Sequence, residues 1–590
     1  GVRLVGSEMC IRDRAHTSLT VPNTISIDSL QSALLAALLA LEDDQPRRDA
    51  ALEYVQRTWP DQQYRLTEDA AAREGGLWLL SPADIALRRR AGRSDSCEWR
   101  PYASSQYASL YEVSPYGDTV DIPGMCTSFA NNGCSSHTES HLERATSWRR
   151  AGKCGAIPGV LKHVPWPAHA SDILPSEARR LLSSQMCFVI EGSALWPSAL
   201  ENFGDASYLA TNLATVNCHV LAAPADNKEF AYFLSGRKFA NLAQANAAGS
   251  DRIIADYQFE KPNVTQLNLP IHAFLESGPH AQGRCLYLQH PLLRPGHAGA
   301  PPAVASAPAT QHHGFGLPGL APTAGMGARM VAAISDIRIH RLRQMEAAVG
   351  VGPWTVCQLF VGNSATAGAR TRMHFDQYDN FYLQISGTKT FRLFDPTQTG
   401  NLAPYPVHHR MDRSAQALPP RADAARGTQV TLRPGDLLFL PAYWWHEVTT
   451  GPLQPGELAV SINFWYSAID SILRPSFPLR PPLRMELSRQ LEYLVSDSFG
   501  DAGRTVPAFF TGLRAQVRES LSRRSLPKPG EFWWPEFERH RPIGIRTTDW
   551  VGLMEYVLWR LLLLLEPGHV YHFLEDLCDV GRFEQLVLSH

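Results

Sequence analysis

His374 and Asp376, a histidine and an aspartate separated by one residue, constrain the fold of this chain most strongly. On a β-strand, residues two apart point to the same face, so the imidazole and the carboxylate can converge on one point. A third candidate ligand, His446, ends the run Tyr443-Trp-Trp-His446. Two histidines and one carboxylate on one side of an ion form the facial triad of non-haem Fe(II) oxygenases, which leaves other coordination positions open. Because His-x-Asp alone is a common pattern, the surrounding sequence has to support the metal site.

The surrounding sequence has the pattern of short strands joined by tight turns. Apolar and β-branched runs lie at 381–386 and 390–394, and we expect these two runs to pair as a hairpin. Pro and Gly in the centre of 433–436 predict a type II turn that leads into a strand at 437–440. A further strand is expected at 458–466. Ligands on or beside short strands predict an α+β fold with a double-stranded β-helix, or jelly-roll, core and flanking helices.

Four ordered blocks of sequence make the metal-site interpretation more specific than the triad alone. They are Thr371-x-x-His374-x-Asp376-x-x-x-Asn380-x-Tyr382-x-Gln384-Ile385-x-Gly387-x-Lys389, then Tyr405-Pro-Val-His-His409 with Asp412-Arg413, then Tyr443-Trp-Trp-His446, and Asn463-Phe-Trp-Tyr466. Together the blocks resemble the Jumonji-C, cupin-type 2-oxoglutarate oxygenases, and more narrowly the asparaginyl hydroxylases of the type called factor inhibiting hypoxia-inducible factor. The resemblance runs from about residue 164 to about residue 514, the larger part of the chain.

The resemblance implies a set of iron and cosubstrate contacts. His374, Asp376 and His446 would hold Fe(II), with 2-oxoglutarate as cosubstrate, O₂ as oxidant and ascorbate as reductant. An ammonium together with hydroxyl groups makes a chemically sensible clamp for a carboxylate. By resemblance, the residues that would contact 2-oxoglutarate are Lys389, Thr371 and Tyr287 at its distal carboxylate, and Asn380 and Asn463 beside its iron-side carboxylate, with Tyr382 in the same pocket.

The residues on the substrate side follow the family in part. By resemblance, Arg413 would hold the amide of the target side chain, and Gln289 and Trp465 would contact the substrate peptide. Ser414 and Tyr378 stand where the family has glutamines. The sequence therefore predicts hydroxylation of protein side chains, with asparagine as the nearest family target. Hydroxylation of another residue, N-methyl-lysine demethylation, and a catalytically inactive interaction module stay open as alternatives.

The chain up to residue 480 divides into three predicted regions. Residues 1–14 have no fold pattern, and we expect a non-native or artefactual leader. Residues 15–163 form an N-terminal extension of unknown role, in which 29–59 is expected to be helical. The oxygenase domain covers 164–480 and contains a flexible insertion rich in Pro, Ala, Gly and His at 293–329.

The remaining residues are expected to be helical. Residues 481–514 contain an amphipathic helix and a second helix, which by resemblance form a dimerisation region. Residues 515–590 form a C-terminal extension that begins with a basic linker at 518–528 and contains an apolar helix at 550–565. Within the oxygenase domain described above, a further helix is expected at 330–349. The predicted partners are a second copy of the chain and a protein substrate, for which an ankyrin-repeat protein is the expected type.

The composition limits the classes of partner and compartment. The net charge is −2, which gives no bulk electrostatic reason to expect nucleic acid or an anionic membrane. The Ala/Leu run at 33–41 is too short to span a bilayer. The 10 cysteines include no Cys-x-x-Cys pair, which favours a reducing compartment. We therefore expect a cytoplasmic or nuclear protein that contacts neither membrane nor nucleic acid.

A group of cysteines and histidines in the N-terminal extension could be interpreted as a zinc site. Its spacing fits no standard zinc module, so an irregular, loop-rich segment with incidental cysteines is the preferred interpretation. The residues of this group are Cys126, Cys134, His137, His141 and Cys154.

Overall fold

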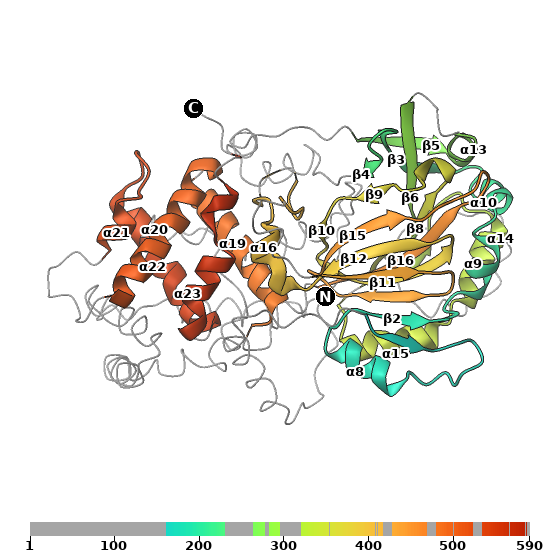
Figure 1. The fold of residues 1–590 in the computed structure, drawn as a ribbon, viewed down its shortest axis with the longest axis horizontal. Coiled ribbons are helices and arrows are strands. Elements are labelled where there is room, and N and C mark those ends of the chain that lie inside the picture. The colour runs from blue at the N-terminus through green and yellow to red at the C-terminus, as the bar shows by residue number, and fades with distance from the viewer. Residues whose placement is uncertain are drawn as a thin grey trace, which may run out of the picture.

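The computed structural model describes most of the chain from residue 161 onward. The described residues are 161–230, 264–277, 283–295, 320–352, 354–407, 409, 411–416, 427–468, 479–499, 501–522, 534–565, 567–583 and 586. The predicted helix at 29–59 and the cysteine–histidine group of the N-terminal extension lie outside these residues. Within them, two facing β-sheets are covered by helices on one side, and a helical region lies at one end (Figure 1).

The two sheets form the jelly-roll core, which confirms the predicted fold class. In order across the sheet, sheet A consists of β1 (His163–Pro165), β2 (Phe188–Glu191), β14 (Leu437–Leu440), β11 (Tyr378–Ser386), β16 (Ala459–Ser467), β8 (Trp354–Gly362), β6 (Arg284–Pro295), β3 (Asn217–Pro224) and β5 (Thr265–Pro270), with β7 (Leu320–Pro322) paired to β6. Sheet B consists of β13 (Thr428–Leu432), β12 (Lys389–Phe394), β15 (Trp445–Thr450), β9 (Arg370–Thr371) and β4 (Glu229–Phe230), with β10 (His374–Phe375) paired to β15.

The central strands β11 and β16 are buried along nearly their whole length. Successive side chains of a strand point to opposite faces, so each strand serves two environments. Phe381 and Ile462 belong to the core between sheet A and the helices. Asn380 and Asn463 line a cavity between the two sheets. The alternation along β11 and β16 therefore places apolar side chains on the outer face and polar side chains on the inner face.

Helices cover the outer face of sheet A and close the larger hydrophobic core (Figure 1). These helices are short, so their stability comes mainly from packing on the sheet. The indole of the buried Trp196 donates a hydrogen bond to the Ala333 carbonyl over 2.7 Å, which satisfies its polar atom. The covering helices are α8 (Ser176–Ser183), α9 (Pro197–Asn202), α10 (Ala206–Asn212), α13 (Ile271–Leu275), α14 (Ala328–Ala333) and α15 (Ile339–Val349).

Aromatic contacts join sheet A to sheet B on two sides of the inter-sheet cavity. On one side, the rings of Phe230 and Tyr287 lie 5.4 Å apart. On the other side, the rings of Tyr382 and Phe391 meet edge to face at 4.9 Å. All four side chains line the cavity. The two sheets are thus held together by apolar clusters that leave a polar space between them.

The expected hairpin at 381–394 is wrong. β11 pairs with β14 and β16 in sheet A, whereas β12 pairs with β13 and β15 in sheet B. Gly387, with a φ of +65°, lies where the chain crosses from one sheet to the other. The local sequence correctly indicates two strands and a tight turn. It does not contain the long-range packing that selects the partner of each strand.

The predicted turn and strands on either side of this crossing are confirmed. In the turn at 433–436, the Asp436 amide donates to the Arg433 carbonyl over 3.0 Å, and Gly435 has a φ of +92°. A positive φ at the third residue is the requirement of a type II turn. The strands predicted at 437–440 and 458–466 correspond to β14 and β16.

The helix expected at 330–349 is interrupted. α14 ends at Ala333, a 3₁₀ turn covers Ile334–Asp336, and α15 begins at Ile339. The Asp336 carboxylate accepts a hydrogen bond from the Ser198 amide over 2.8 Å. This contact ties the break to α9. The apolar periodicity of the sequence continues through the break, which explains why the pattern predicts a single helix.

The insertion expected at 293–329 overlaps two strands of sheet A. β6 continues to Pro295, and β7 pairs with this end of β6. Residues 296–319 lie outside the described residues. The two ends of the predicted insertion therefore belong to sheet A.

The C-terminal helices form one packed region, and the predicted boundary between 514 and 515 lies within α20 (Ala502–Ser522). Phe509 packs edge to face on Phe537 at 5.2 Å and on Trp550 at 5.4 Å, and all three side chains are 0% exposed. Helices of the same chain therefore cover much of the apolar surface expected to face a partner, and the homodimer stays a prediction. The helices are α19 (Pro481–Phe499), α20 (Ala502–Ser522), α21 (Pro535–Glu538), α22 (Thr547–Leu564) and α23 (Pro567–Asp576).

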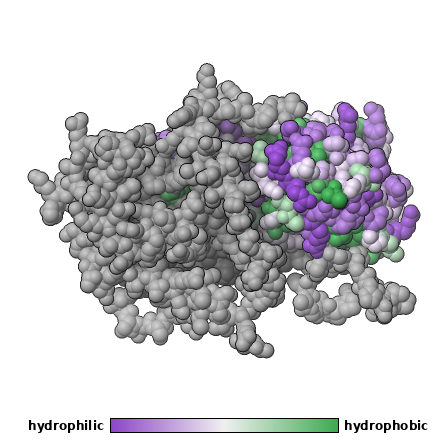
Figure 2. Space-filling model, turned by 90° about the horizontal axis from the view of Figure 1, so that it is seen from below, coloured by the Kyte–Doolittle hydropathy of each residue, from purple (hydrophilic) through white to green (hydrophobic). Residues whose placement is uncertain are grey.

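The described surface carries few large apolar side chains. Figure 2 shows one face of the molecule, on which the coloured residues are mostly hydrophilic with small hydrophobic patches. The exposed large apolar residues among those described are Ile173, Met186, Leu267 and Ile543. Within the described helices, none combines the length and the hydropathy that a bilayer crossing requires.

Replacing Gly387 with alanine should destabilise the fold by about 2–4 kcal/mol. The positive φ alone costs about 1 kcal/mol, and a Cβ atom would meet the Ala459 Cα at 3.0 Å, which adds an overpacking cost. Gly456→Ala is the matched control, since Gly456 has a φ of +87° but nothing within 4 Å of the added atom. Equilibrium urea unfolding of both variants measures the difference. Equal losses of stability would contradict the close approach at Gly387.

Candidate metal centre

The pairing of β10 with β15 brings the two histidines together. His374 and His446 are directly opposed in the antiparallel register of these strands. Asp376 follows β10 by one residue, and its carbonyl accepts a hydrogen bond from the Tyr443 amide over 2.7 Å. The segments that carry the three candidate ligands are therefore joined by backbone hydrogen bonds on both sides.

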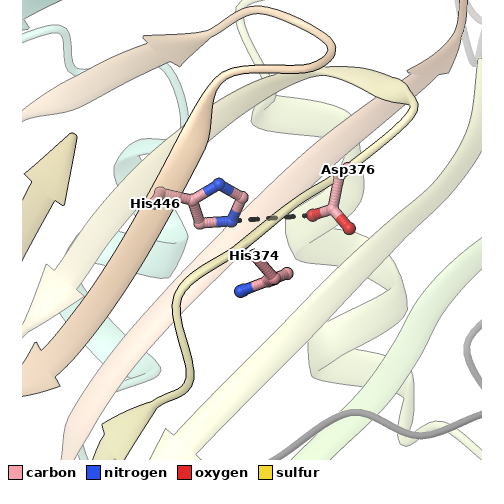
Figure 3. Close-up of side chains that lie close together, drawn as sticks. All are labelled: His374, Asp376 and His446. Carbon is pink, nitrogen blue, oxygen red and sulfur yellow. Dashed lines mark ion pairs between the residues drawn. The ribbon is translucent and has the colours of Figure 1, made fainter. Parts of the chain in front are cut away.

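The three side chains converge on a common point (Figure 3). One ligand atom from each of His374, Asp376 and His446 lies within 4.8 Å of the others. The two imidazole rings are 4.2 Å apart between centroids, and the Asp376 Oδ2 lies 3.7 Å from the His446 Nε2. This cluster has the donor set and the spacing of a facial metal site. The described residues thus bring together all three metal ligands that the sequence predicts.

Backbone carbonyls orient both imidazoles. The Nδ1 of His374 lies 2.7 Å from the carbonyl of Arg372, and the Nδ1 of His446 lies 3.0 Å from the carbonyl of Trp444. A carbonyl oxygen accepts hydrogen bonds, so each Nδ1 carries the proton and each Nε2 keeps its lone pair. Both histidines are therefore held in the tautomer that binds a metal through Nε2.

The electrostatics of the cluster favour the metal-binding protonation states. Burial would raise the pKa of Asp376, but His374, His446 and Arg413 together lower it below its usual value. Burial, followed by the neighbouring His374, lowers the pKa of His446 to about 4. At neutral pH the aspartate is thus ionised and the His446 imidazole is neutral. Both states are the ones that coordinate a cation.

The twelve site residues predicted from the sequence lie around one cavity between the sheets. Their side chains come from β6, β9, β10, β11, β12, β15, β16 and the segments next to them, so distant parts of the chain contribute to each wall. The residues are Tyr287, Gln289, Thr371, His374, Asp376, Asn380, Tyr382, Lys389, Arg413, His446, Asn463 and Trp465.

Lys389 is the most unusual charge in the cavity. Its side chain is 2% exposed, and burial lowers the pKa of its ammonium from about 10.5 to about 7. The hydroxyl of Tyr287 accepts a hydrogen bond from the Nζ, and Ser461 Oγ lies 3.4 Å away. In the described part of the chain, no carboxylate contributes to the pKa of this ammonium. A buried ammonium surrounded by hydroxyls is a binding site for an anion.

Several buried polar atoms of the cavity wall have no hydrogen-bond partner within the protein. They include Oδ1 of Asn380, Oδ1 of Asn463 and the Nε1 of Trp465. Buried polar atoms are rarely left unpaired, because each lost hydrogen bond costs about 1–3 kcal/mol. The residues present therefore fit a polar, charged ligand in the cavity beside the three candidate metal ligands.

The substrate-side residues surround the mouth of the same cavity. Arg413 has a φ of +69°, and its Nη1 lies 3.5 Å from the Asp376 Oδ1. Tyr378, which the sequence analysis marked as a departure from the family, stacks on Trp465 with ring centroids 5.8 Å apart. An aromatic stack thus lies in this part of the wall, where the resemblance to the asparaginyl hydroxylases implies a glutamine. Gln289 lies in the same cavity, on β6.

Ser461, which was not predicted from the sequence, contacts two residues of the cavity wall. Its Oγ accepts a hydrogen bond from the Tyr382 hydroxyl over 2.6 Å and lies next to the Lys389 ammonium. Ser461 shares the inner face of β16 with Asn463 and Trp465, two and four residues further on. The two-residue period of the strand was the signal that could have identified it.

Helix α19 holds the segments that carry the site, through contacts that sequence reasoning did not anticipate. The Glu486 carboxylate accepts hydrogen bonds from the Gln377 amide over 3.1 Å and from the Tyr443 hydroxyl over 3.0 Å. Gln377 is adjacent to Asp376. Arg489 donates to the Asp412 carboxylate over 2.9 Å, beside Arg413. Partners up to 109 residues apart in sequence make these contacts, so no local pattern reveals them.

A second buried pair anchors the same helix from the other side. Glu492 accepts a hydrogen bond from the Val407 amide over 2.9 Å and forms an ion pair with Arg582, near the end of the described chain. Glu492 is 1% exposed and Arg582 is 4% exposed. α19 is therefore fixed between the site and the C-terminal helices.

The family of the domain follows from comparison with known proteins. Residues 305–472 match the family model described as a cupin-like domain. The chain is 30% identical over 113 residues to Lysine-specific demethylase JMJ31 of Arabidopsis thaliana, which is 18% of this chain and 20% of that protein. It is 28% identical over 128 residues to human Bifunctional peptidase and (3S)-lysyl hydroxylase JMJD7, which is 17% of this chain and 39% of that protein. The chain carries a cupin-like Jumonji-C domain.

The matches to the Jumonji-C domain are partial. HSPB1-associated protein 1 of Rattus norvegicus is 35% identical over 108 residues, which is 17% of this chain and 22% of that protein. The chain thus covers well under half of the length of each of these relatives. Their names point to lysine where they state a target, and they do not specifically support the narrower resemblance to asparaginyl hydroxylases.

Replacing Arg489 with methionine should lower the free energy of unfolding by about 3–5 kcal/mol, because it leaves the buried Asp412 carboxylate without a partner. Arg504→Met is the matched control, since Arg504 pairs with Asp501 on the surface and should contribute less than about 1 kcal/mol. Adding Asp412→Leu to Arg489→Met should restore most of the loss. Urea unfolding measures all three variants, and a small effect of Arg489→Met alone would contradict the proposed support of the site by α19.

Replacing Lys389 with methionine should stabilise the ligand-free protein at pH 6 by about 2–4 kcal/mol while removing the anion-binding group. The folded-state pKa of about 7 lies below the unfolded value of 10.5, so the folded state is penalised when both states are protonated. The penalty disappears as the pH rises from 7 to above 10.5. The gain in stability should therefore be smaller at pH 10 than at pH 6. A pH-independent effect in thermal unfolding would contradict the burial of a charged ammonium.

Proposed function

We propose that this protein is an Fe(II)- and 2-oxoglutarate-dependent dioxygenase that hydroxylates protein side chains. The observation that carries the proposal is the combination, in one cavity, of the His374–Asp376–His446 cluster and the buried Lys389 ammonium. A group of three metal-ligand side chains alone would fit many functions. The same group beside an anion site, between the sheets of a Jumonji-C domain, supports an oxygenase that uses a carboxylate cosubstrate.

The residues present fit iron and 2-oxoglutarate. The two Nε2 lone pairs and the Asp376 carboxylate would hold Fe(II), and Lys389 with the Tyr287 hydroxyl would bind the distal carboxylate of 2-oxoglutarate. The Thr371 hydroxyl accepts a hydrogen bond from the Val448 amide over 3.0 Å, so its own proton is available to the same carboxylate. Once bound, Fe(II) and 2-oxoglutarate would allow O₂ to be used as the oxidant, so that one oxygen atom converts a substrate C–H bond into C–OH and the other enters succinate, with release of CO₂.

The protein contributes position and exclusion of water. Asn380 and Asn463 offer their unpaired amide oxygens, or after a flip of the amide their N–H groups, to the ligand in the cavity. The inter-sheet aromatic residues enclose the space between Lys389 and the metal cluster. Arg413, whose Nη1 lies 3.5 Å from the Asp376 Oδ1, would orient the side chain that is oxidised. In this proposal each residue binds or orients, and the redox step belongs to the metal and its cosubstrate.

The charges of the cavity favour a neutral or anionic target side chain. Among the charged residues of the described wall, Arg370, Lys389 and Arg413 are cationic and Asp376 is anionic. A divalent metal and the doubly charged 2-oxoglutarate would offset each other, so the cavity keeps a net positive charge. A lysine side chain at the mouth would be repelled by Arg413, whereas an amide would accept its hydrogen bonds. This reasoning favours an amide side chain such as asparagine as the target. An ankyrin-repeat protein is proposed as the substrate from the sequence resemblance alone.

Lysine as the target is the second candidate. It is favoured by the names of two relatives, a lysine-specific demethylase and a lysyl hydroxylase. The aromatic stack of Tyr378 and Trp465 is also compatible with an aliphatic or methylated cationic side chain. An inactive barrel that serves as a homodimeric interaction module is the third alternative, and the intact metal cluster argues against it.

A reducing compartment is part of the proposal. All cysteines of the described residues are buried free thiols. Such thiols are typical of cytoplasmic and nuclear proteins. The compartment also supplies 2-oxoglutarate, and ascorbate or another reductant to keep iron in the Fe(II) state. The thiols are Cys187, Cys218, Cys285, Cys357 and Cys578.

Purified protein supplied with Fe(II), ascorbate, O₂ and 2-oxoglutarate should release succinate. His374→Ala should reduce succinate release by at least about 100-fold, because it removes one of three metal ligands. His340→Ala, which changes a surface histidine that is 52% exposed, is the matched control and should retain turnover. Turnover that survives in His374→Ala would contradict the ligand assignment. Absence of turnover in a wild-type protein that binds iron would favour the inactive module.

Mass spectrometry of added substrates separates the target hypotheses. An ankyrin-repeat protein with exposed asparagines should stimulate succinate release and gain one oxygen on asparagine. A lysine peptide and an N-methyl-lysine peptide serve as comparators, which would gain an oxygen or lose a methyl group if lysine is the target. Stimulation by the lysine peptides alone would contradict the charge argument based on Arg413.

A further inference from the structure

A second pocket lies at one end of sheet A, apart from the metal cavity. It forms where the start of β3, the end of β6 and the segment after β7 meet. His219 of β3 and His290 and Arg294 of β6 line it, together with Thr215 and Thr323. None of its lining residues belongs to the wall of the metal cavity.

Strand β6 separates the two sites. Gln289 lines the metal cavity, and the next residue, His290, lines the second pocket. Successive residues of a strand point to opposite faces, so one strand can present side chains to two different spaces. The second pocket is therefore a site of its own and not an extension of the cavity that the three candidate metal ligands line.

His290 gives the second pocket its chemical character. Its side chain is 2% exposed, yet neither ring nitrogen has a hydrogen-bond partner in the protein. Its ring lies 5.7 Å from the ring of His219, between centroids. Burying a histidine without hydrogen-bond partners is unfavourable, so such groups usually meet a water or a ligand.

The other walls of the pocket indicate the sign of the ligand's charge. The Arg294 guanidinium opposes the binding of a metal cation by the two histidines. Burial, His219 and Arg294 lower the pKa of His290 to about 3, so the ring is neutral at pH 7 and offers one N–H donor. One fixed cation and N–H donors match a singly charged, planar oxyanion better than a phosphate, which carries more charge.

We propose that this pocket binds the carboxylate group of a small organic acid, with Arg294 as the cationic partner and His219 and His290 as hydrogen-bond donors. The guanidinium fork matches the two oxygens of a carboxylate. The surrounding residues bury the ring of His290 and hold it in place. The ring would therefore fix the position of the ligand. This site is independent of the iron, of 2-oxoglutarate and of the oxygenase proposal.

The direct test is an NMR titration with acetate. Protein labelled with ¹³C at the histidine rings is titrated at pH 7 and constant ionic strength, with sodium chloride as the balancing salt. The His290 ring signal, assigned by its absence in His290→Phe, should shift saturably with a midpoint in the millimolar range, about that of a weak ligand. No saturable shift up to about 100 mM acetate would overturn the proposal and leave water as the occupant.

Two variants locate the effect. Arg294→Gln should weaken the acetate midpoint by at least about tenfold, whereas Arg180→Gln, a surface arginine that is 64% exposed, should not change it. Lys389→Met should also leave the shift intact, because Lys389 belongs to the metal cavity. An unchanged midpoint in Arg294→Gln, or loss of the shift in Lys389→Met, would overturn the assignment to this pocket.

Inorganic phosphate is the second probe and tests the class of anion. It should shift the His290 signal more weakly than acetate at the same concentration. Tighter binding of phosphate than of acetate, lost in Arg294→Gln, would overturn the carboxylate class.

Discussion

His374 and His446 face each other because β10 and β15 pair in an antiparallel register, and a slip of one residue would turn one imidazole away from the other. β15 is itself fixed by six residue pairs with β12, which carries Lys389 at its first position. The metal cluster and the anion site are therefore set by the same sheet. Sheet A closes the cavity from the opposite side, and its inner-face residues reach the same space.

The site is built at the expense of local stability. Lys389 and the unpaired amide oxygens of Asn380 and Asn463 are buried in a cavity that a purely structural core would fill with apolar side chains. The structure compensates elsewhere, with the apolar clusters that join the sheets and with the buried polar contacts of α19. Such a distribution is expected where binding requires charged groups that are already desolvated and in place.

Much of the fold and of the site could be predicted from local sequence, and the errors share one physical cause. The strands at 437–440 and 458–466 and the turn at 433–436 follow from residue type and period. The wrong hairpin between β11 and β12 arose because two adjacent strands need not be partners. Partner choice depends on residues far away in the chain, which a single sequence does not relate to one another.

The same distinction applies to the candidate site. The predicted residues lie around one cavity. They could be predicted because strand alternation and the family resemblance both assign them to the inner faces of the sheets. Ser461 could have been predicted from the alternation of side chains along β16. Glu486 and Arg489 could not have been, since they are buried charges on a helix that the family resemblance assigned to a dimerisation region. Their role follows from contacts with Gln377, Tyr443 and Asp412 that exist in the folded chain alone.

The contacts of Glu492 have a consequence for the timing of folding. This residue connects the segment before Asp412 to Arg582, 90 residues further along the chain. During synthesis, the barrel strands emerge before the residues that lock α19 in place, and contacts of such long range form late. The segments around Asp376 and Arg413 should thus reach their final rigidity only after residue 582 has been synthesised. Binding of a metal would then follow translation of the barrel and would depend on the region that comes after it.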